Sequence, residues 1–560
     1  MADCQEMIYS NEYMDFILNY TSPTGKRLFQ EFGCKEIINA EFAIIHVNRK
    51  EETGSGRYLQ YRNMPRVFGL LDTSHLEASG VSRVQRLPNL DLYGQGVIFG
   101  ILDTGIDYRH PAFQNEDGSS RIGVIWDQTI PSDTPPEGLN YGTVYDNETI
   151  NQALKSEDPL LVVPSMDEDG HGTFLAGIAA GSARKEQDFS GVAPLCELAV
   201  VKLKGAKEYL RNFWLIPEGV TAFQETDIFT GIRFILEYAY RQNKPFVLML
   251  GCGTNAGNHG KTGYLKYYLN NISSFSGRGI VLPAGNEGSL SHHFRGNGLE
   301  MKEYQDVELH VAEGEKGFLA ELWAEAPDTY SIGFLSPQGE YSQKLPLSIR
   351  DGGIEVGFVF EKTRIMVFYE PVERMTGDML IWIRMSDPTP GIWRLRVFKE
   401  NVLIGRYDIW LPMEHFIKKD TYFLKPDPDT TICEPGNGAY PMTVTAYDHQ
   451  NGNLFFQASR GFTRDGGVKP DFAAPGVNVF GPALNGGYRT GTGTSVAAAV
   501  AAGCSVLLFN YSPYYTGLQL SNLFIKGTTR KNIIYPNKEW GFGEINLYRS
   551  LESLRGSVTE

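Results

Sequence analysis

The sequence predicts an α/β protein: a parallel sheet with helices on both faces, a small α/β unit before it and an antiparallel β domain inserted into it. Short apolar runs rich in β-branched residues, such as 96–103 and 279–284, are typical of buried parallel strands. Alternating segments such as 391–397 are typical of antiparallel strands. Because the chain has 560 residues, it is too long for one ordinary domain.

The elements follow one another in four predicted segments. The first, 1–73, carries its own apolar run at residues 42–47 and forms the small α/β unit. Segments 74–299 and 431–560 together form the parallel-sheet domain. Segment 300–430 forms a β-sandwich or jelly roll between them, because its strands alternate and are separated by Gly-containing turns.

The run 96–103 ends in Asp103, which the pattern places at the carboxyl end of a buried strand. Open α/β sheets bind their ligands at that edge. His171 follows an Asp-Gly turn and lies just inside a helix rich in Gly and Ala, so it can face the same edge. An imidazole and a carboxylate brought together in this way can serve general acid and base chemistry.

Ser495 lies where a Gly-Thr turn enters an Ala-rich helix. A hydroxyl there lies at the positive end of the helix dipole, as a nucleophile requires, although a capping Ser is the commoner explanation of any single Ser. A catalytic serine also needs an imidazole and a carboxylate, and His171 and Asp103 supply both. An α/β-hydrolase is excluded because its His follows the Ser, and no His follows Ser495.

In the chain order Asp103, His171, Ser495, these segments resemble the subtilisin-type serine proteases. The resemblance implies that Ser495 is the nucleophile, His171 the general base and Asp103 the carboxylate that orients it. A fourth segment, Leu-Pro-Ala-Gly-Asn-Glu-Gly, matches the family where Asn286 donates to the oxyanion. Such a donor is worth roughly 3 to 4 kcal/mol.

Gly251, Cys252 and Gly253 follow the apolar run 246–250 and lack the full glycine spacing of a dinucleotide-binding loop. The resemblance implies instead that they form the backbone wall that pairs with an extended substrate, and we call them the substrate wall. Gly251 stands where subtilisins often have Ser, so the preferred substrate sequence stays open.

Subtilisins carry an N-terminal prodomain that assists folding and then occupies the cleft. The stretch 81–85 looks like the start of a mature subtilisin, so self-cleavage is expected around Asp72, Thr73 and Ser74. The resemblance therefore implies a zymogen whose first partner is its own prodomain.

Three departures from the usual subtilisin sequence indicate which branch of the family this chain resembles. Val496 replaces the usual Met, Ala499 replaces the usual Pro, and Phe174 replaces the second His of His-Gly-Thr-His. With the inserted domain, these resemble the clostridial germination-specific subtilases, the Csp proteases of spore formers. That implies a spore protease that activates a cortex hydrolase precursor during germination, a cleaved prodomain that stays bound, and related germination subtilases as further partners.

Composition excludes other classes. A net charge of −15 argues against nucleic-acid binding. No apolar run is expected to reach the roughly 18 residues of a membrane span, and the N-terminus lacks a basic segment followed by an apolar one, so no signal peptide is predicted. We expect synthesis in the cytoplasm of the sporulating cell. The six Cys show no paired spacing and are predicted to be buried free thiols.

No metal or other cofactor is predicted. Loop solvation and helix N-terminal charge account for the acids at 167–169. His292 and His293 form no metal-spaced set with a Cys pair, while Asp107 and His110 are expected to be structural. Two other functions stay open: a protease-like regulator without turnover and a general intracellular subtilisin. Whether the inserted domain braces the protease or binds a partner also stays open.

Overall fold

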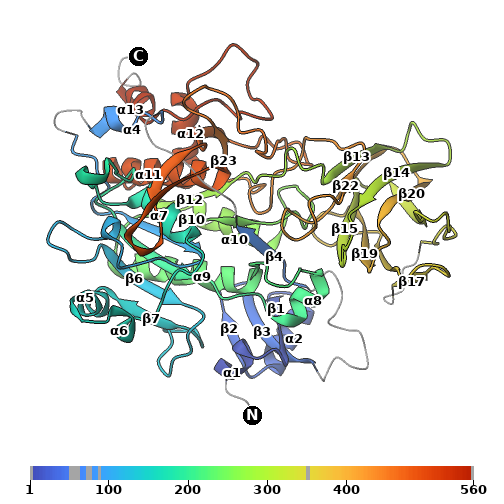
Figure 1. The fold of residues 1–560 in the computed structure, drawn as a ribbon, viewed down its shortest axis with the longest axis horizontal. Coiled ribbons are helices and arrows are strands. Elements are labelled where there is room, and N and C mark those ends of the chain that lie inside the picture. Colours follow the sequence, from blue (N-terminus) through green and yellow to red (C-terminus); the bar gives the residue numbers. More distant parts are fainter. Residues whose placement is uncertain (1–3, 50–63, 71–77, 86–89, 348–352, 556–560) are drawn as a thin grey trace.

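The computed structural model describes residues 4–49, 64–70, 78–85, 90–347 and 353–555. An eight-stranded sheet forms its centre, in the order β24-β23-β12-β10-β5-β8-β6-β7 (Figure 1). All neighbouring strands are parallel except the antiparallel pair β6 and β7. The strands are β5 (Ile98–Asp103), β6 (Ile122–Asp127), β7 (Thr143–Asp146), β8 (Glu197–Lys202), β10 (Phe246–Leu250), β12 (Arg278–Pro283), β23 (Met442–Tyr447) and β24 (Phe472–Pro475).

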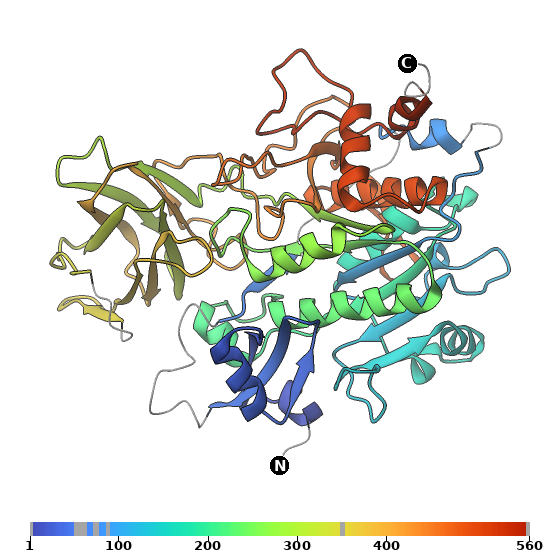
Figure 2. The same cartoon turned by 180° about the vertical axis from the view of Figure 1, so that it is seen from behind.

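Helices cover both faces of this sheet, which confirms the predicted fold class. One face packs on α7 (His171–Ala180) and α11 (Thr494–Tyr511), with α4 (Val81–Gln85), α5 (Asn147–Lys155), α12 (Gly517–Gly527) and α13 (Leu547–Arg555) around them. The other face packs on α9 (Glu225–Gln242) and α10 (Tyr264–Ser273), which cross the front of Figure 2. The short elements α6 (Pro159–Val162), α8 (Glu208–Trp214) and the hairpin β25 (Val479–Pro482) and β26 (Tyr488–Gly491) lie in the connections.

Helix α11 is almost wholly apolar because it is the central helix of this core. By length and composition it alone among the described helices could cross a membrane, and 89% of it is buried inside the protein. The expectation that no apolar run reaches this length is therefore wrong. The Ala residues that let the helix pack closely on the sheet, together with its Val and Leu residues, also give it the hydropathy of a span.

Residues 4–49 form the N-terminal unit. Its antiparallel sheet has the order β1-β3-β2, from β1 (Tyr13–Asn19), β2 (Lys35–Ile37) and β3 (Phe42–Asn48), with α1 (Cys4–Tyr9) and α2 (Pro23–Glu31) beside it. Cys4 and Cys34 form a disulfide with a Cα–Cα distance of 5.4 Å. The prediction of free thiols is wrong for this pair, because folding brings together two Cys residues that are 30 positions apart. Cys196, Cys252, Cys433 and Cys504 are free and buried.

Two antiparallel sheets form the inserted sandwich, which extends to one side of the molecule in Figure 1. The first has the order β13-β21-β15-β19-β18-β17, from β13 (His293–Asn297), β15 (Gly317–Ala324), β17 (Ile354–Gly357), β18 (Arg364–Glu370), β19 (Met379–Ser386) and β21 (Arg406–Trp410). The second has the order β16-β20-β14-β22, from β14 (Tyr304–Val311), β16 (Thr329–Leu335), β20 (Gly391–Asn401) and β22 (Tyr422–Phe423). Both sheets contribute to one apolar core.

A third small sheet joins segments that are far apart in the sequence. Strand β4 (Val67–Leu70) lies between β9 (Phe223–Gln224) and β11 (Cys252–Gly253), antiparallel to both. The residues just after the N-terminal unit are therefore fixed against the parallel-sheet domain.

Candidate active site

Asp103 and His171 are in direct contact at the carboxyl edge of the central sheet. Asp103 is the last residue of β5 and His171 is the first residue of α7. The His171 Nδ1 atom lies 2.8 Å from Asp103 Oδ1, and both side chains are almost fully buried. In this arrangement the carboxylate fixes the ring and favours the tautomer with hydrogen on Nδ1.

Thr104 fixes the geometry of this pair. Its backbone N–H donates to Asp103 Oδ1 at 2.8 Å, and its hydroxyl accepts a hydrogen bond of 2.9 Å from the N–H of Gly172. The threonine therefore joins the end of β5 to the first turn of α7. Because both contacts involve backbone groups, the strand and the helix hold Asp103 and His171 in register.

Gly251 closes the other side of Asp103. An ideal Cβ on Gly251 would lie 2.0 Å from Asp103 Oδ2, so only glycine leaves room for the carboxylate in its present position. The neighbouring Cys252 is buried, and burial raises the pKa of its thiol well above the ordinary value. The thiol is therefore protonated and is not a nucleophile near neutral pH.

Thr494 connects Ser495, its neighbour in the sequence, with Asn286, to which it is hydrogen-bonded. Helix α11 begins at Thr494, so Ser495 lies in its first turn, at the positive end of the helix dipole. The Oδ1 atom of Asn286 accepts hydrogen bonds from the backbone N–H and the hydroxyl of Thr494, at 3.1 and 3.0 Å. Thr494, the neighbour of Ser495 in the sequence, therefore fixes the orientation of the Asn286 amide.

The substrate wall carries a strand of the chain itself. Cys252 pairs with Leu70 and Gly253 pairs with Gly69 in antiparallel register, and β9 pairs with the other edge of β4. An extended peptide that adds to a strand edge makes such a ladder. The predicted cleavage positions Asp72, Thr73 and Ser74 begin two positions after the end of this strand and lie outside the described residues.

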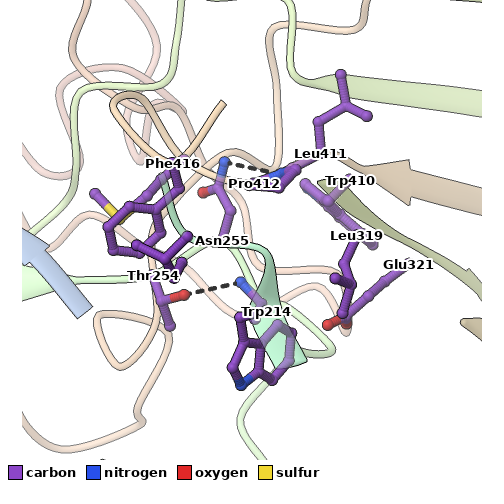
Figure 3. A pocket seen from close by; sticks show the side chains of 12 residues that line it. Trp214, Thr254, Asn255, Leu319, Glu321, Trp410, Leu411, Pro412 and Phe416 are labelled. Atoms are coloured by element: carbon purple, nitrogen blue, oxygen red, sulfur yellow. Dashed lines mark hydrogen bonds between the residues drawn. The ribbon is translucent and has the colours of Figure 1, made fainter. Parts of the chain in front are cut away.

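The inserted sandwich packs against the residues that follow the substrate wall in the sequence. Figure 3 shows Thr254 and Asn255 facing Leu319 and Trp410 of the sandwich across a cavity of about 20 Å³. Glu321, on β15, accepts a hydrogen bond of 2.9 Å from the backbone N–H of Gly257. The sandwich therefore braces the loop that follows the wall.

The other polar residues singled out in the sequence have structural contacts. Asp167 accepts from the backbone N–H groups of Gly170 and Thr173, each at 2.8 Å, and so shapes the turn into α7. His110 accepts from the N–H of Ala112 at 3.0 Å, and Asp107 pairs with Arg109 at 2.9 Å.

The two neighbouring histidines also lie in structural contacts. His292 contacts Glu287 at 2.6 Å, and His293 contacts Asp408 at 3.0 Å. Within the residues that the structure describes, no group of three His, Cys, Asp or Glu side chains could hold a metal ion.

Several residues near the site could not be identified from the sequence. Glu225 and Glu434 lie far from every motif, yet both contact Arg66, the residue that precedes β4. Only a fold that brings residues 66 and 434 together could identify them. Thr494, in contrast, belongs to the Gly-Thr-Ser motif, and its link to Asn286 could have been expected from that motif.

Comparisons with known proteins identify similar sequences and similar structures. The model of the subtilase family matches residues 94–308 and 424–543. C5a peptidase of Streptococcus pyogenes is 21% identical over 448 residues, 76% of this chain and 36% of that protein. Serine protease AprX of Bacillus subtilis is 30% identical over 145 residues, 22% of this chain and 33% of that protein. The chain thus spans about a third of the length of these curated relatives.

Among solved structures, the CspB protease of Clostridium perfringens is similar along most of the chain. It matches with a TM-score of 0.76 and 32% identity, over 86% of this chain and 97% of that chain. The similarity therefore covers more than the segments that the family model matches.

Proposed function

The chain belongs to the subtilase family, and on that premise we propose that it is a serine endopeptidase in which Ser495, His171 and Asp103 carry out acyl transfer. The observation that carries the proposal is the buried 2.8 Å contact between His171 Nδ1 and Asp103 Oδ1. It leaves Nε2 as the basic nitrogen of the ring, which is the atom a serine hydroxyl needs.

In the proposed reaction the Ser495 oxygen attacks the scissile carbonyl while His171 Nε2 takes the hydroxyl proton. The oxyanion accepts hydrogen bonds from the Asn286 amide and the Ser495 backbone N–H. Collapse of this intermediate breaks the C–N bond, and His171 gives its proton to the leaving amine. Water then hydrolyses the acyl-enzyme by the same proton transfers in reverse.

Gly251→Ala is expected to lower kcat/KM by about 10²- to 10⁴-fold, because the new Cβ would displace the Asp103 carboxylate from His171. Steady-state hydrolysis of a peptide substrate measures the loss. Gly205→Ala is the matched control, since no atom lies within 4 Å of its added Cβ. Equal activity of the two variants would show that Asp103 does not need its present position.

We also propose that the chain cleaves itself after β4. The pairing of Leu70 with Cys252 supports this, because it adds β4 to the substrate wall in the antiparallel register of a bound extended peptide. Intact-mass measurement of the purified chain is expected to give two fragments, with the break near Asp72 to Ser74. A single unbroken chain in a preparation with peptidase activity would contradict self-cleavage.

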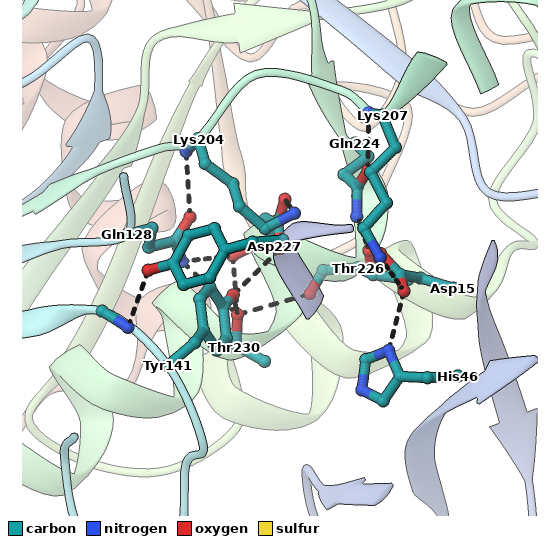
Figure 4. Close-up of polar contacts among 12 residues, drawn as sticks. Asp15, His46, Gln128, Tyr141, Lys204, Lys207, Gln224, Thr226, Asp227 and Thr230 are labelled. Carbon is teal, nitrogen blue, oxygen red and sulfur yellow. Dashed lines mark hydrogen bonds and ion pairs between the residues drawn. The ribbon is translucent and has the colours of Figure 1, made fainter. Parts of the chain in front are cut away.

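The N-terminal unit is proposed to stay bound after cleavage, held by the buried polar network of Figure 4. Asp15 of β1 accepts from Lys207 Nζ at 2.8 Å and from Gln224 Nε2 at 2.7 Å, and it contacts His46 Nδ1 at 2.7 Å. Although burial alone would raise it, Lys207 and His46 hold the pKa of Asp15 well below its ordinary value. Separation would break these short, charge-assisted contacts, and Asp15 and Lys207 would each exchange a charged partner for water.

Apolar contacts add to this retention. Ile8, Phe42 and Ile44 of the N-terminal unit pack into the core beneath α9 and α10. A separate cluster joins Phe16 and Val47 to α8 and to the inserted sandwich. Breaking one peptide bond beyond β4 leaves all of these contacts in place.

The binding of the cleaved N-terminal unit to the rest of the protein is expected to weaken as pH rises from 5 to 8. The dissociation constant of this unit should increase about tenfold or more. Burial raises the pKa of Glu36 to about 7, an effect that His46 and the Asn140 N–H only partly offset. Because the bound unit holds the proton more tightly than the separated unit, binding is strongest where Glu36 is protonated. Size-exclusion chromatography of the processed protein at several pH values measures release.

Glu36→Gln is the matched variant for this prediction, since it keeps the size of the side chain and removes its titration. Its dissociation constant is expected to vary much less over the same interval. Asp15 does not oppose the trend, because its lowered pKa places its own effect below pH 4. A wild-type dissociation constant that stays constant from pH 5 to 8 would contradict the prediction.

From the resemblance to the Csp proteases we propose that the substrate is the precursor of a spore cortex hydrolase, clipped during germination, and that the protein is located in the spore. The similarity to the CspB protease supports this. Incubation of the purified chain with such a precursor tests it by gel and mass spectrometry. A regulator without turnover is the second candidate, because β4 occupies the substrate wall.

A further inference from the structure

Arg66 is fixed against the parallel-sheet domain at its backbone and at its side chain. Its N–H donates to Glu225 Oε2 at 3.3 Å, and its carbonyl accepts from the Glu225 N–H at 2.9 Å. Its Nη1 atom donates to Glu434 Oε2 at 2.8 Å, and 21% of the side chain is exposed. The residue just before β4 therefore occupies a defined pocket.

The walls of this pocket fit a flat guanidinium group. Gly257 has a φ of +127°, and a Cβ there would lie 2.8 to 2.9 Å from Cζ and both Nη atoms of Arg66. Glycine is needed both for this backbone conformation and for the close approach of the guanidinium. Glu321 of the inserted sandwich holds the Gly257 N–H, so the sandwich supports this wall.

Charge balance in the pocket depends on Arg66. Glu434 is 1% exposed and contacts Lys266 Nζ at 2.6 Å, while Glu225 is 7% exposed. Burial lowers the pKa of His259, whose backbone N–H also contacts Glu434, to about 4, so this ring is neutral at neutral pH. Burial raises the pKa of Glu225, and Arg66 partly offsets this effect. Without Arg66, Glu434 would keep Lys266 as its ion-pair partner, and the charged form of Glu225 would be less favourable. The empty pocket would therefore attract a cation.

A substrate that replaces β4 on the substrate wall takes the same register. Leu70 pairs with Cys252, and Arg66 is four residues upstream of Leu70. We propose that Glu434, Glu225 and Gly257 form a distal subsite that selects arginine in the substrate, four residues before the one that faces Cys252. Arginine is preferred over lysine because its planar group fits flat on Gly257 and has several donors. This inference rests on the proposed endopeptidase function.

The test uses the processed full chain and synthetic peptides with the sequence of residues 64–79. One peptide keeps Arg66, a second has Gln there, and a third exchanges Arg66 with Val67, which moves the arginine to the opposite face of the strand. The first is expected to be hydrolysed with a kcat/KM about tenfold or more above the other two. Mass spectrometry identifies the bond that is cut.

Variants of the enzyme assign the preference to the pocket. Glu434→Gln is expected to bring the ratio between the first two peptides close to one, while Glu186→Gln, at an exposed position, leaves the ratio unchanged. Equal hydrolysis of the three peptides by the wild type, or an unchanged ratio in Glu434→Gln, overturns the subsite and leaves the endopeptidase function intact. If the wild type cuts neither the peptides nor itself, both the subsite and the endopeptidase function are overturned.

If the bound N-terminal unit prevents peptides from binding, self-cleavage provides a second measurement. Arg66→Gln and Glu434→Gln are each expected to slow the appearance of the cleaved form about tenfold on refolding. The double variant is expected to be no slower than either single variant, because both remove the same interaction. Additive slowing would overturn the subsite.

Discussion

Ser495→Ala is expected to abolish peptide hydrolysis, with kcat falling about a millionfold. The substitution removes only the hydroxyl oxygen that attacks the scissile carbonyl, and Ala suits the first turn of α11. Peptide turnover should therefore disappear while the fold is kept. Circular dichroism and thermal unfolding establish the fold, and a fluorogenic peptide assay establishes the loss.

Ser505→Ala is the matched control for this experiment. Ser505 lies on the same helix and is buried, and its hydroxyl donates to the carbonyl of Ala501 at 2.8 Å. Its loss is expected to change stability by about 1 kcal/mol and kcat very little. Peptidase activity or a cleaved N-terminal segment in pure Ser495→Ala would disprove the assignment of the nucleophile.

Asp103→Asn is expected to lower kcat about 10⁴-fold at neutral pH, the second largest effect. An amide at this position can present its NH₂ group to His171 Nδ1 and so favour the tautomer in which Nε2 carries the hydrogen. That tautomer cannot take the proton of Ser495. The pH–rate profile is the sharper measurement, because a purely structural loss would lower its height without changing its shape.

Asp107→Asn provides the comparison for Asp103→Asn. Asp107 is also buried close to the end of β5, but its carboxylate contacts Arg109 and the backbone N–H of Asn485. This variant is expected to lose stability with little change in kcat. If Asp103→Asn keeps more than a tenth of the wild-type kcat, Asp103 does not orient the imidazole.

The strand and helix ends that hold Asp103, His171 and Ser495 could be predicted from sequence because each depends on a short local pattern. A buried run ending in Asp, or a Gly-rich turn entering an Ala-rich helix, specifies its element within about ten residues. The confirmed fold class follows from the same patterns, because parallel buried strands need helices on both faces.

Contacts between distant segments could not be predicted in this way. Arg66 and Glu434 are 368 positions apart, and Asp15 and Lys207 are 192 apart. Each of these charged residues would be read from sequence as a solvated surface residue, since charged side chains are rarely buried without a partner. Only the packing of the N-terminal unit and the inserted sandwich on the parallel-sheet domain supplies the partners.

The inserted sandwich also affects how the site can assemble. The contact between Asn286 and Thr494 joins positions 208 residues apart, across the whole insertion. Yet the two ends of the insertion lie next to each other: the N–H of Phe423 donates to the carbonyl of Ser291 at 3.0 Å. Once the sandwich has folded, the chain that must close to bring Asn286 to Thr494 is much shorter, which lowers the entropic cost by about 1 kcal/mol. During synthesis, the sandwich can therefore fold while the segment that carries Ser495 is still being made.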